Sequence, residues 1–446
     1  MLSERFWKFT TLVFCVWLLP LYSFAGEESG YLISDVNLVP MTSETIIPNQ
    51  SVYVEGAAIK EICPAKEECG PRGIPQIDGR GKYLMPGLAD MHTHLDFLIL
   101  ATPSMSDVEK EEAERILTQQ LTQYVLFGVT TVRDTAGSVR NLQTREEIET
   151  GKRVGPRIFA AHILMDGEPP LHGASVPFSS PEKAVAQVRE SAELGFDFIK
   201  VYSALSQDVY DAIMDEAARL GIPVIGHLPM QIDFEHALEK GLKSIEHMSG
   251  YDVACAKGLE EMRPAVGDVY QGYAYCTPDK IRALAELTAR YPVWVTPTLI
   301  VADSVKAEYD RYAVIDEDEQ RYTPPKMRMF TEYWYEIFSH RDRAALAGTR
   351  SVRLGLVKAL EDAGVPLLLG TDTMASGYNV HKEMRLMAEA GLTPYQVLVA
   401  ATAEPARFFG KEGEFGTLVV GASADMVLLE DNPLEDIGNV SRIAGV

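Results

Sequence analysis

Residues 87–94 read GLADMHTH, a short apolar run that ends in two histidines at alternate positions. Successive side chains of a β-strand point to opposite faces, so His92 and His94 would project to the same side. Two imidazoles on one face can bind the same metal ion. Because two polar residues on a half-buried strand are also common, the meaning of this pair depends on what the rest of the chain places beside it.

Seven further segments have the length and apolar character of buried β-strands, and amphipathic helical stretches separate most of them. The strand candidates are residues 129–134, 157–161, 198–202, 224–227, 244–248, 293–298 and 367–372. The clearest helical stretches are residues 182–194, 207–220, 234–240 and 278–291. Strands that alternate with helices form parallel sheets. Together with residues 87–94 they predict an α/β chain whose main domain, residues 86–409, is a TIM-like (β/α)8 barrel.

Both ends of the chain carry short β-rich runs broken by Pro, Gly and Asn. They lie at residues 31–36, 51–54 and 58–62, and again at residues 416–420 and 425–429. We expect residues 30–85 and 410–446 to build one small β-sandwich domain together.

The barrel domain also contains an insertion at residues 301–352, which is charged and rich in aromatic residues. It lies between the last two strand candidates. Long insertions of this kind are often functional. The segment is either a helical lid over the site or a peripheral helical insertion that never contacts substrate.

The first 25 residues have the arrangement of a secretory signal peptide. Arg5 and Lys8 precede an apolar stretch over residues 10–22, and small residues follow up to Ala25. The stretch is shorter than the ~20 residues of a spanning helix, and a proline interrupts it. We therefore expect residues 1–25 to be removed, a periplasmic or secreted mature protein, and no stable membrane anchor.

The composition excludes one class of partner. With 46% hydrophobic and 24% charged residues the chain is an ordinary globular protein. Its formal net charge of −23 at pH 7 gives an acidic surface that repels nucleic acid. A small-molecule substrate is the expected partner, and assembly into a homo-oligomer is left open.

Four of the five cysteines lie outside the predicted signal peptide, as two local couples. Cys63 is close to Cys69, and Cys255 is close to Cys276. Neither couple has the C-x-x-C spacing of a structural zinc site, so two short-range disulfides are favoured. Four cysteines allow three pairings, and the other two stay open at this point.

Four of the other strand candidates end in, or close to, a residue that can bind a metal ion. These residues are Lys200, His227, His247 and Asp372. In a (β/α)8 barrel the carboxyl ends of all strands converge on one face, where the chemistry of such barrels takes place. Of the nine histidines in the chain, four fall at these ends. The pattern therefore predicts a metal site that joins His92 and His94 to these four side chains.

The strand ends also lie in recognisable motifs. These are LMPGLADMHTH at 84–94, GVTTVRD at 128–134, FIKV at 198–201, GH at 226–227, IEH at 245–247 and GTD at 370–372. In these motifs the chain resembles the amidohydrolase superfamily, in the branch of imidazolonepropionase-like proteins and metal-dependent prolidase-like dipeptidases, which cleave Xaa-Pro or Xaa-Arg. The resemblance covers residues 30–440, and the combined motifs are highly specific for the superfamily.

The resemblance implies two divalent metal ions, usually zinc. Their ligands would be His92, His94 and Asp372 on one side and His227 and His247 on the other, with Lys200, carboxylated by carbon dioxide, as the bridge. A carbamate offers two anionic oxygens to ions about 3.5 to 4 Å apart, which an ammonium cannot do. If Lys200 is instead a surface lysine, the site would hold one ion.

Several residues have expected roles beside metal binding. A hydroxide that bridges two cations is a nucleophile at neutral pH, because metal binding lowers the pKa of water to about 7. Asp372 could accept its proton and pass it to the leaving amine, as both ligand and general acid/base. Tyr202 points to the same side of its strand as Lys200, where its hydroxyl could contact substrate. His162 and His172 are either contacts for an anionic end of the substrate or solvated loop residues.

The first functional hypothesis is hydrolysis of an amide bond, in a dipeptide or an N-acyl amino acid. A lactone, ester or phosphotriester substrate is the alternative on the same binuclear site, and a cyclic amide, as in imidazolonepropionase, is another. The export signal favours a dipeptide over imidazolonepropionase, since histidine breakdown is normally cytoplasmic. A non-catalytic scaffold would be expected to have lost ligands, whereas here all six positions are filled.

Overall fold

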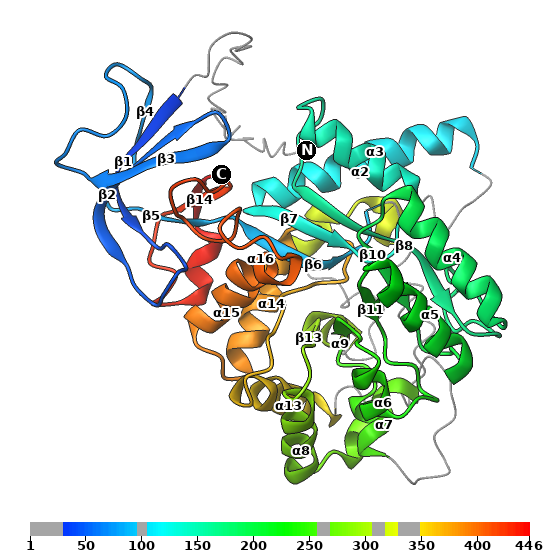
Figure 1. Ribbon diagram of the computed structural model, residues 1–446. Coiled ribbons are helices and arrows are strands. Elements are labelled where there is room, and N and C mark those ends of the chain that lie inside the picture. Colours follow the sequence, from blue (N-terminus) through cyan, green and yellow to red (C-terminus); the bar gives the residue numbers. More distant parts are fainter. Residues whose placement is uncertain (1–29, 96–104, 257–267, 306–316, 329–347) are drawn as a thin grey trace, which may run out of the picture.

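The computed structural model describes residues 30–95, 105–256, 268–305, 317–328 and 348–446, and the segment predicted to be a signal peptide lies outside them. A barrel of parallel strands is surrounded by helices, and a smaller sheet stands at one side of it (Figure 1). Among the described helices, none combines the length and the apolar character that a membrane crossing requires.

Seven parallel strands form most of the barrel. In spatial order they are β6 (Leu88–Thr93), β7 (Val129–Asp134), β8 (Arg157–Asp166), β10 (Phe198–Val201), β11 (Val224–Gly226), β12 (Ser244–Glu246) and β13 (Trp294–Thr296). A short strand, β9 (Val176–Pro177), pairs with the end of β8 outside this ring.

Residues 366–372 close the ring between β13 and β6. On one side, the backbone N–H of Leu368 donates to the carbonyl of Val295 (2.9 Å). On the other side, the N–H of Met91 donates to the carbonyl of Leu369 and that of Asp372 to the carbonyl of His92, both at 2.8 Å. The predicted (β/α)8 barrel is therefore confirmed, with a hydrogen-bonded segment in place of a regular eighth strand.

The four helices expected from the sequence are all present, as α4 (Pro181–Leu194), α5 (Gln207–Leu220), α6 (Phe234–Glu239) and α8 (Pro278–Thr288). The other described α-helices are α2 (Asp107–Leu126), α3 (Val139–Glu149), α7 (Tyr251–Cys255), α9 (Leu299–Val305), α10 (Glu317–Tyr322), α13 (Arg350–Asp362), α14 (Tyr378–Glu389), α15 (Pro394–Ala401) and α16 (Ala403–Phe409). Their termini follow from local chemistry. The Ser106 hydroxyl and the Glu109 carboxylate form a capping box at the start of α2, and Gly221 ends α5 in a left-handed conformation.

The barrel interior consists of three layers along its axis. The amino-terminal layer is apolar and includes Phe159 and Phe198, with Phe408 of α16 inserted from below. The middle layer contains the buried pair Arg133 and Glu246. The carboxyl-terminal layer holds the histidines predicted from the sequence. Two layers of the interior are therefore polar, and only the lowest is an ordinary hydrophobic core.

A second, larger core lies between the barrel strands and the surrounding helices. Val132, Val201 and Ile245 on the outer faces of the strands are fully buried. They belong to the same cluster as Val188 of α4 and Ile213 of α5. Burial of such side chains contributes about 1.5 to 3 kcal/mol each, so this outer core is where the helices are held to the barrel.

The small sheet is built from both ends of the chain. Its strands are β1 (Gly30–Leu38), β2 (Ile47–Glu55), β3 (Ala58–Pro64), β4 (Gln76–Asp78), β5 (Tyr83–Pro86), β14 (Met426–Leu429) and β15 (Ile443–Gly445). The order is β15-β14-β5-β1-β2-β3, and β4 pairs with β1. The predicted joining of the two ends is confirmed. The strands form one continuous sheet, and its edge strand β3 turns back to residue 422, where the N–H of Ile59 donates to the Ala422 carbonyl (2.9 Å).

One strand expected in this region does not form. Residues 416–420 are irregular, because Gly416 and Gly421 both adopt left-handed backbone angles, with φ of 77° and 93°, and leave too few residues between two turns. Leu418 nevertheless joins the core of the small sheet and donates its N–H to the Pro40 carbonyl (3.0 Å).

Both disulfides favoured by the sequence are present. Cys63 is bonded to Cys69 at the end of β3, and Cys255 is bonded to Cys276 next to α7. The other two pairings are thereby excluded. The first bond closes a loop on the small sheet, and the second closes a 21-residue interval beside the barrel.

The structure describes part of the insertion predicted at 301–352. The ring of Tyr322 in α10 stacks on Tyr378 of α14, with centroids 5.0 Å apart. Nearby, the Glu319 carboxylate accepts from Lys382 (2.7 Å). The other Phe, Tyr and Trp residues of the insertion lie at positions 309–338, outside the described residues. The lid therefore stays a prediction.

Candidate active site

Three of the predicted ligands meet at the carboxyl-terminal end of the barrel. One ligand atom from each of His92, His94 and Asp372 lies within 4.8 Å of the other two. The closest approach is between His94 Nε2 and Asp372 Oδ1, at 3.1 Å. His92 is buried, whereas the side chains of His94 and Asp372 are 17% and 23% exposed. The cluster is therefore reached from outside through His94 and Asp372.

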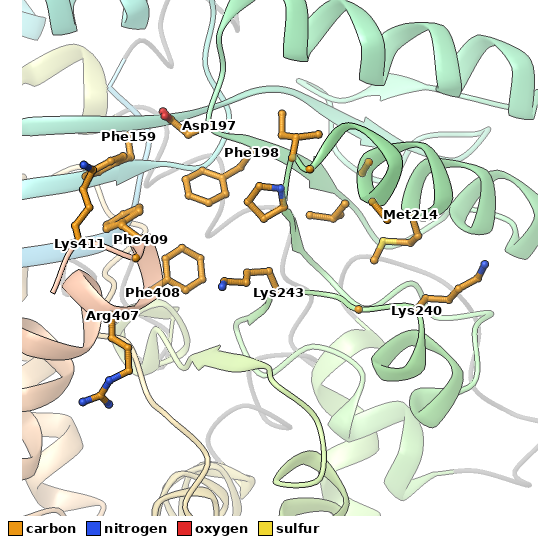
Figure 2. Close-up of a pocket in the computed structure, with 18 residues that line it drawn as sticks. Phe159, Asp197, Phe198, Met214, Lys240, Lys243, Arg407, Phe408, Phe409 and Lys411 are labelled. Atoms are coloured by element: carbon orange, nitrogen blue, oxygen red, sulfur yellow. The ribbon is translucent and has the colours of Figure 1, made fainter.

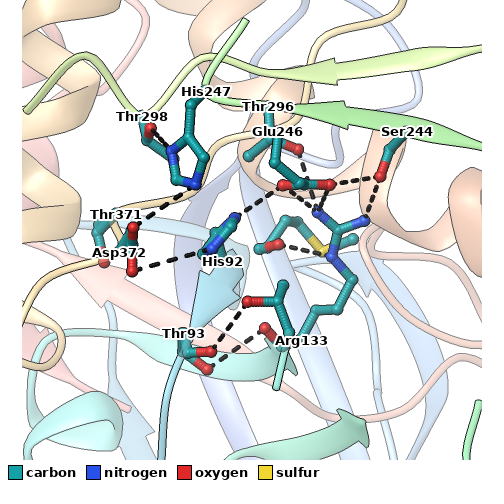
Figure 3. Close-up of polar contacts among 12 residues, drawn as sticks. His92, Thr93, Arg133, Ser244, Glu246, His247, Thr296, Thr298, Thr371 and Asp372 are labelled. Atoms are coloured by element: carbon teal, nitrogen blue, oxygen red, sulfur yellow. Dashed lines mark hydrogen bonds and ion pairs between the residues drawn. The ribbon is translucent and has the colours of Figure 1, made fainter. Parts of the chain in front are cut away.

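Two more histidines lie beside this cluster. The His247 ring is 4.5 Å from His92 and 4.8 Å from His227, between ring centroids. His247 Nε2 is 3.6 Å from Asp372 Oδ2 (Figure 3). Asp372 thus faces three histidines from the ends of two strands, β6 and β12, and both of its oxygens lie next to imidazole nitrogens.

The Nδ1 atoms of three of these histidines are occupied by hydrogen-bond partners. His92 Nδ1 lies 2.8 Å from Glu246 Oε2. His227 Nδ1 lies 2.9 Å from Ser203 Oγ, and His247 Nδ1 lies 2.6 Å from Thr298 Oγ1. Such outer partners fix the orientation and the tautomer of histidines that bind metals. The arrangement directs the Nε2 atoms of these rings toward the centre of the cluster.

Lys200 has the surroundings expected of a carboxylated lysine rather than of a surface lysine. Its side chain is buried in the barrel interior, and Nζ has no hydrogen-bond partner among the described residues. Burial lowers the pKa of the Lys200 ammonium to about 8. Carbon dioxide reacts with the neutral amine, which is accessible near neutral pH at such a pKa. A buried ammonium without a hydrogen-bond partner among the described residues is costly, so the position fits a carbamate with metal partners.

The backbone at the strand ends brings adjacent residues to the same side. Glu246 and His247 follow each other, so regular alternation would point them to opposite faces. His247 has a φ of 60°, and Asp372 has a φ of 50°. Non-glycine residues rarely adopt these angles, which cost about 1 to 3 kcal/mol and concentrate at functional sites. The turn at His247 allows both Glu246 and His247 to face the barrel interior.

The buried pair of Arg133 and Glu246 supports the cluster from below and was not among the predicted site residues. Arg133 Nη2 donates to both Glu246 oxygens at 2.8 and 2.9 Å, and Nη1 donates to Ser244 Oγ at 2.9 Å. Burial alone would raise the pKa of Glu246, but Arg133 and Lys200 outweigh it and hold the pKa below its usual value. Glu246 therefore stays anionic and accepts from His92. Its place in the IEH motif, next to a predicted ligand, was the one available signal.

Asp90 ties the first strand to the closing segment. Its carboxylate accepts from the backbone N–H of Thr371 (3.0 Å) and from the Thr371 hydroxyl (2.7 Å). Burial raises the pKa of Asp90 to about 7. Asp90 lies two residues before His92, and Thr371 directly precedes Asp372. The contact between Asp90 and Thr371 therefore fixes the position of Asp372 relative to His92.

The three predicted substrate contacts separate into two groups. The Tyr202 ring lies 4.0 Å from His227 and 5.9 Å from His172, between ring centroids. Both Tyr202 and His172 are therefore at the carboxyl-terminal end of the barrel. The side chain of His172 is partly buried, and burial lowers its pKa.

His162 does not belong to the site, and that prediction was wrong. The expected strand end at 161 is the middle of β8, which continues to Asp166. His162 lies on the outer side of the strand, where its ring stacks on Phe196 (4.3 Å) and Nδ1 is 2.9 Å from Ser191 Oγ of α4. It is thus part of the contact between barrel and helix.

The parallel barrel gathers histidines, a buried lysine and an aspartate at its carboxyl-terminal end, which is where the active sites of enzymes with this kind of barrel lie. Residues 83–446 match the amidohydrolase family. The chain belongs to this family, which confirms the resemblance found in its motifs.

Three relatives illustrate the range of similar proteins. Ochratoxinase of Aspergillus niger is 23% identical over 409 residues, which cover 81% of this chain and 73% of that protein. Imidazolonepropionase of Shewanella loihica is 25% identical over 274 residues, covering 51% of this chain and 67% of the relative. A crystal structure of a prolidase in complex with N-methylphosphonate-L-proline is 21% identical, with a TM-score of 0.69, and the match covers 93% of this chain and 97% of that one.

Proposed function

We propose that this protein is a metal-dependent hydrolase that cleaves an amide bond in a dipeptide or an N-acyl amino acid. The observation that carries the proposal is the cluster of His92, His94 and Asp372, with His227, His247 and the buried Lys200 beside it. Membership of the amidohydrolase family supports hydrolysis of an amide bond.

The residues present fit two divalent metal ions, which we propose to be zinc. His92, His94 and Asp372 would hold one ion, His227 and His247 the other, and a carboxylated Lys200 would join them. Imidazole nitrogens and carboxylate oxygens are ordinary zinc ligands. When bound, the ions would supply Lewis-acid activation of water and of the scissile carbonyl.

Asp372 is suited to move a proton between water and the leaving nitrogen. Burial alone would raise the pKa of Asp372, but the neighbouring His92, His94 and His247 outweigh it and hold the pKa well below the usual range. The carboxylate is therefore ionised and ready to accept a proton. Because the Asp372 side chain is partly exposed, it would contact a substrate bound above the cluster.

Tyr202 and His172 are the proposed substrate contacts. They lie together at the barrel end, next to His227. A phenol and an imidazole can donate to the free carboxylate of an amino acid product. The similar prolidase structure is in complex with N-methylphosphonate-L-proline. This likeness supports an N-acyl amino acid as the substrate class.

The test is a substrate panel assayed with purified protein and metal analysis. We expect turnover with dipeptides or N-acyl amino acids, and little with lactones, esters, phosphotriesters or cyclic amides. His247→Ala should lose at least one equivalent of metal by elemental analysis. Unchanged metal content in that variant, or turnover confined to the other substrate classes, would refute the proposal.

We further propose that the mature protein acts in the periplasm or outside the cell. The support is the basic and apolar sequence of residues 1–25. Two disulfides in the described part of the chain agree with an oxidising compartment. Amino-terminal sequencing of the protein exported by its host should begin close to residue 26, and a start at Met1 would contradict this.

A further inference from the structure

A hollow lies at the amino-terminal end of the barrel, opposite the candidate active site. It has a volume of about 620 Å³ and lies between the amino-terminal ends of β8, β10 and β11, the end of α5, and the end of α16 with the two residues that follow it (Figure 2). Sites for small molecules usually have volumes of about 300 to 1,000 Å³. This hollow, which we call the lower cleft, is therefore large enough for one.

Aromatic rings form one wall of the lower cleft. Phe159, Phe198, Phe408 and Phe409 all line it. The rings of Phe159 and Phe409 are stacked, with centroids 3.7 Å apart, and Phe408 stands at 5.3 Å from Phe409 in an edge orientation. On the other side lie Met214 and small residues of α5. Such walls accept a flat or bulky apolar group.

The polar residues of the lower cleft are mostly basic, on a chain whose net charge is −23. Three of its four cations have acidic partners close by. These pairs are Lys240 with Asp215 (2.7 Å), Arg407 with Glu404 (2.5 Å) and Lys411 with Glu414 (2.8 Å). The one acid in the wall, Asp197, is paired with Arg145 (2.8 Å).

Lys243 differs from the other three cations. It has no acidic partner among the described residues, and its Nζ lies over the rings of Trp294 (4.4 Å) and Phe408 (5.4 Å). Its side chain is only partly exposed. The ammonium therefore lies against aromatic rings at the wall of the lower cleft, and no carboxylate of the described residues balances its positive charge.

We propose that the lower cleft is a second binding site, which takes a small monoanion with an aromatic or bulky apolar body. Lys243 would bind the anionic group, and the rings of Phe408 and Phe409 would contact the apolar body. One unbalanced cation matches one negative charge, whereas a polyphosphate would need several. The proposal does not depend on the reaction at the other end of the barrel.

The probe is 8-anilinonaphthalene-1-sulfonate, a monoanionic aromatic fluorophore, titrated at low ionic strength. We expect saturable binding at one site. Lys243→Met should weaken it about tenfold, the value of one charged contact. Ala218→Trp should abolish it, because Ala218 is exposed on α5 at the cleft wall and an indole there would fill the space. Lys183→Met, at an exposed lysine of α4, is the matched control and should bind normally.

Two comparisons make the result decisive. The uncharged N-phenyl-1-naphthylamine should bind at least about tenfold more weakly than the sulfonate, by the same charged contact. Asp372→Asn should bind the sulfonate normally. Unchanged affinity in both Lys243→Met and Ala218→Trp, equal affinity for the uncharged compound, or loss of binding in Asp372→Asn would overturn the proposal. Near-ultraviolet circular dichroism establishes that each variant is folded.

Discussion

The two ends of the barrel interior have opposite chemistry. At the carboxyl-terminal end, buried histidines are held by side-chain partners, as His247 is by Thr298. At the amino-terminal end, Phe198 and Phe408 pack against each other, with ring centroids 5.6 Å apart. Hydrogen bonds depend on angle, so at the carboxyl-terminal end they fix the orientation of the imidazole rings. At the amino-terminal end, close packing of the aromatic rings fills the interior. The barrel thereby separates the residues that position chemistry from those that stabilise the fold.

The middle layer of the barrel interior contacts both the polar layer and the apolar layer. The Arg133 guanidinium lies 4.9 Å above the Phe408 ring and donates to Glu246, which in turn accepts from His92. A buried ion pair is costly to separate, since removal of one partner leaves the other charged and unpaired. The pair therefore allows a polar layer to rest on an apolar one.

The largest expected effect concerns chemistry at the carboxyl-terminal end. Asp372→Asn should lower kcat about 10³-fold, within the range for loss of a general acid/base, while the bound metal changes little. The amide keeps the shape of the side chain but cannot accept the proton. Steady-state kinetics and elemental analysis of the same preparation test this. Near-normal turnover would contradict the role of Asp372.

A substitution at Phe408 tests the contribution of the amino-terminal end to stability. Phe408→Ala should lower the free energy of unfolding by about 3 kcal/mol or more, because it leaves a cavity in the buried aromatic layer. Phe408 is 3% exposed. Denaturant unfolding measures the loss. The contrast between the two ends would fail if Phe408→Ala kept full stability, or if Asp372→Asn were destabilised as strongly.

A smaller effect is expected from the partners of the histidines. Thr298→Val removes the hydroxyl next to His247 Nδ1 without changing the shape of the side chain. Metal affinity should fall about tenfold, the low end for loss of an outer partner. Thr298→Ser keeps the hydroxyl and should retain the affinity. Competition with a chelator measures both, and equal affinities in the two variants would argue against this contact.

The smallest effect is the dependence of stability on pH that His247 contributes at the carboxyl-terminal end. Burial lowers the pKa of His247 to about 4, from 6.5 for an exposed histidine. Between these values the unfolded chain binds more protons than the folded one, so stability is complete above pH 6.5 and is lost as the pH falls toward 4. The loss should be about 1 kcal/mol per pH unit for each such histidine.

The Tm of metal-free protein between pH 4 and 8 measures this slope. His247→Gln should reduce the slope. His236→Gln is the control, because His236 pairs with Asp211 near the surface of α6 and α5 (2.8 Å). A slope that does not change in His247→Gln would mean that the acid sensitivity arises elsewhere.

Much of this could be predicted from the sequence, because parallel strands bring their carboxyl ends together. That single rule placed His92, His94, His227, His247, Lys200 and Asp372 on one face. What it could not supply were features that break regular alternation. The φ of 60° at His247 is a property of the folded backbone, and the extra length of β8 moved His162 away from the site. Arg133 and Glu246 were missed because the rule considers strand ends and not the layer beneath them.

The small sheet has a consequence for how the chain is made. Strand β5 at residues 83–86 pairs with β14 at residues 426–429, and β15 adds to β14 at the very end of the sequence. During synthesis the amino-terminal strands emerge first and wait for partners more than 300 residues away. Contacts so distant in sequence form slowly, and unpaired strand edges aggregate. Residues 426–429 thus complete a sheet whose first strand begins at residue 30, and a ribosome that stalls before residue 426 leaves β5 without β14 at its edge.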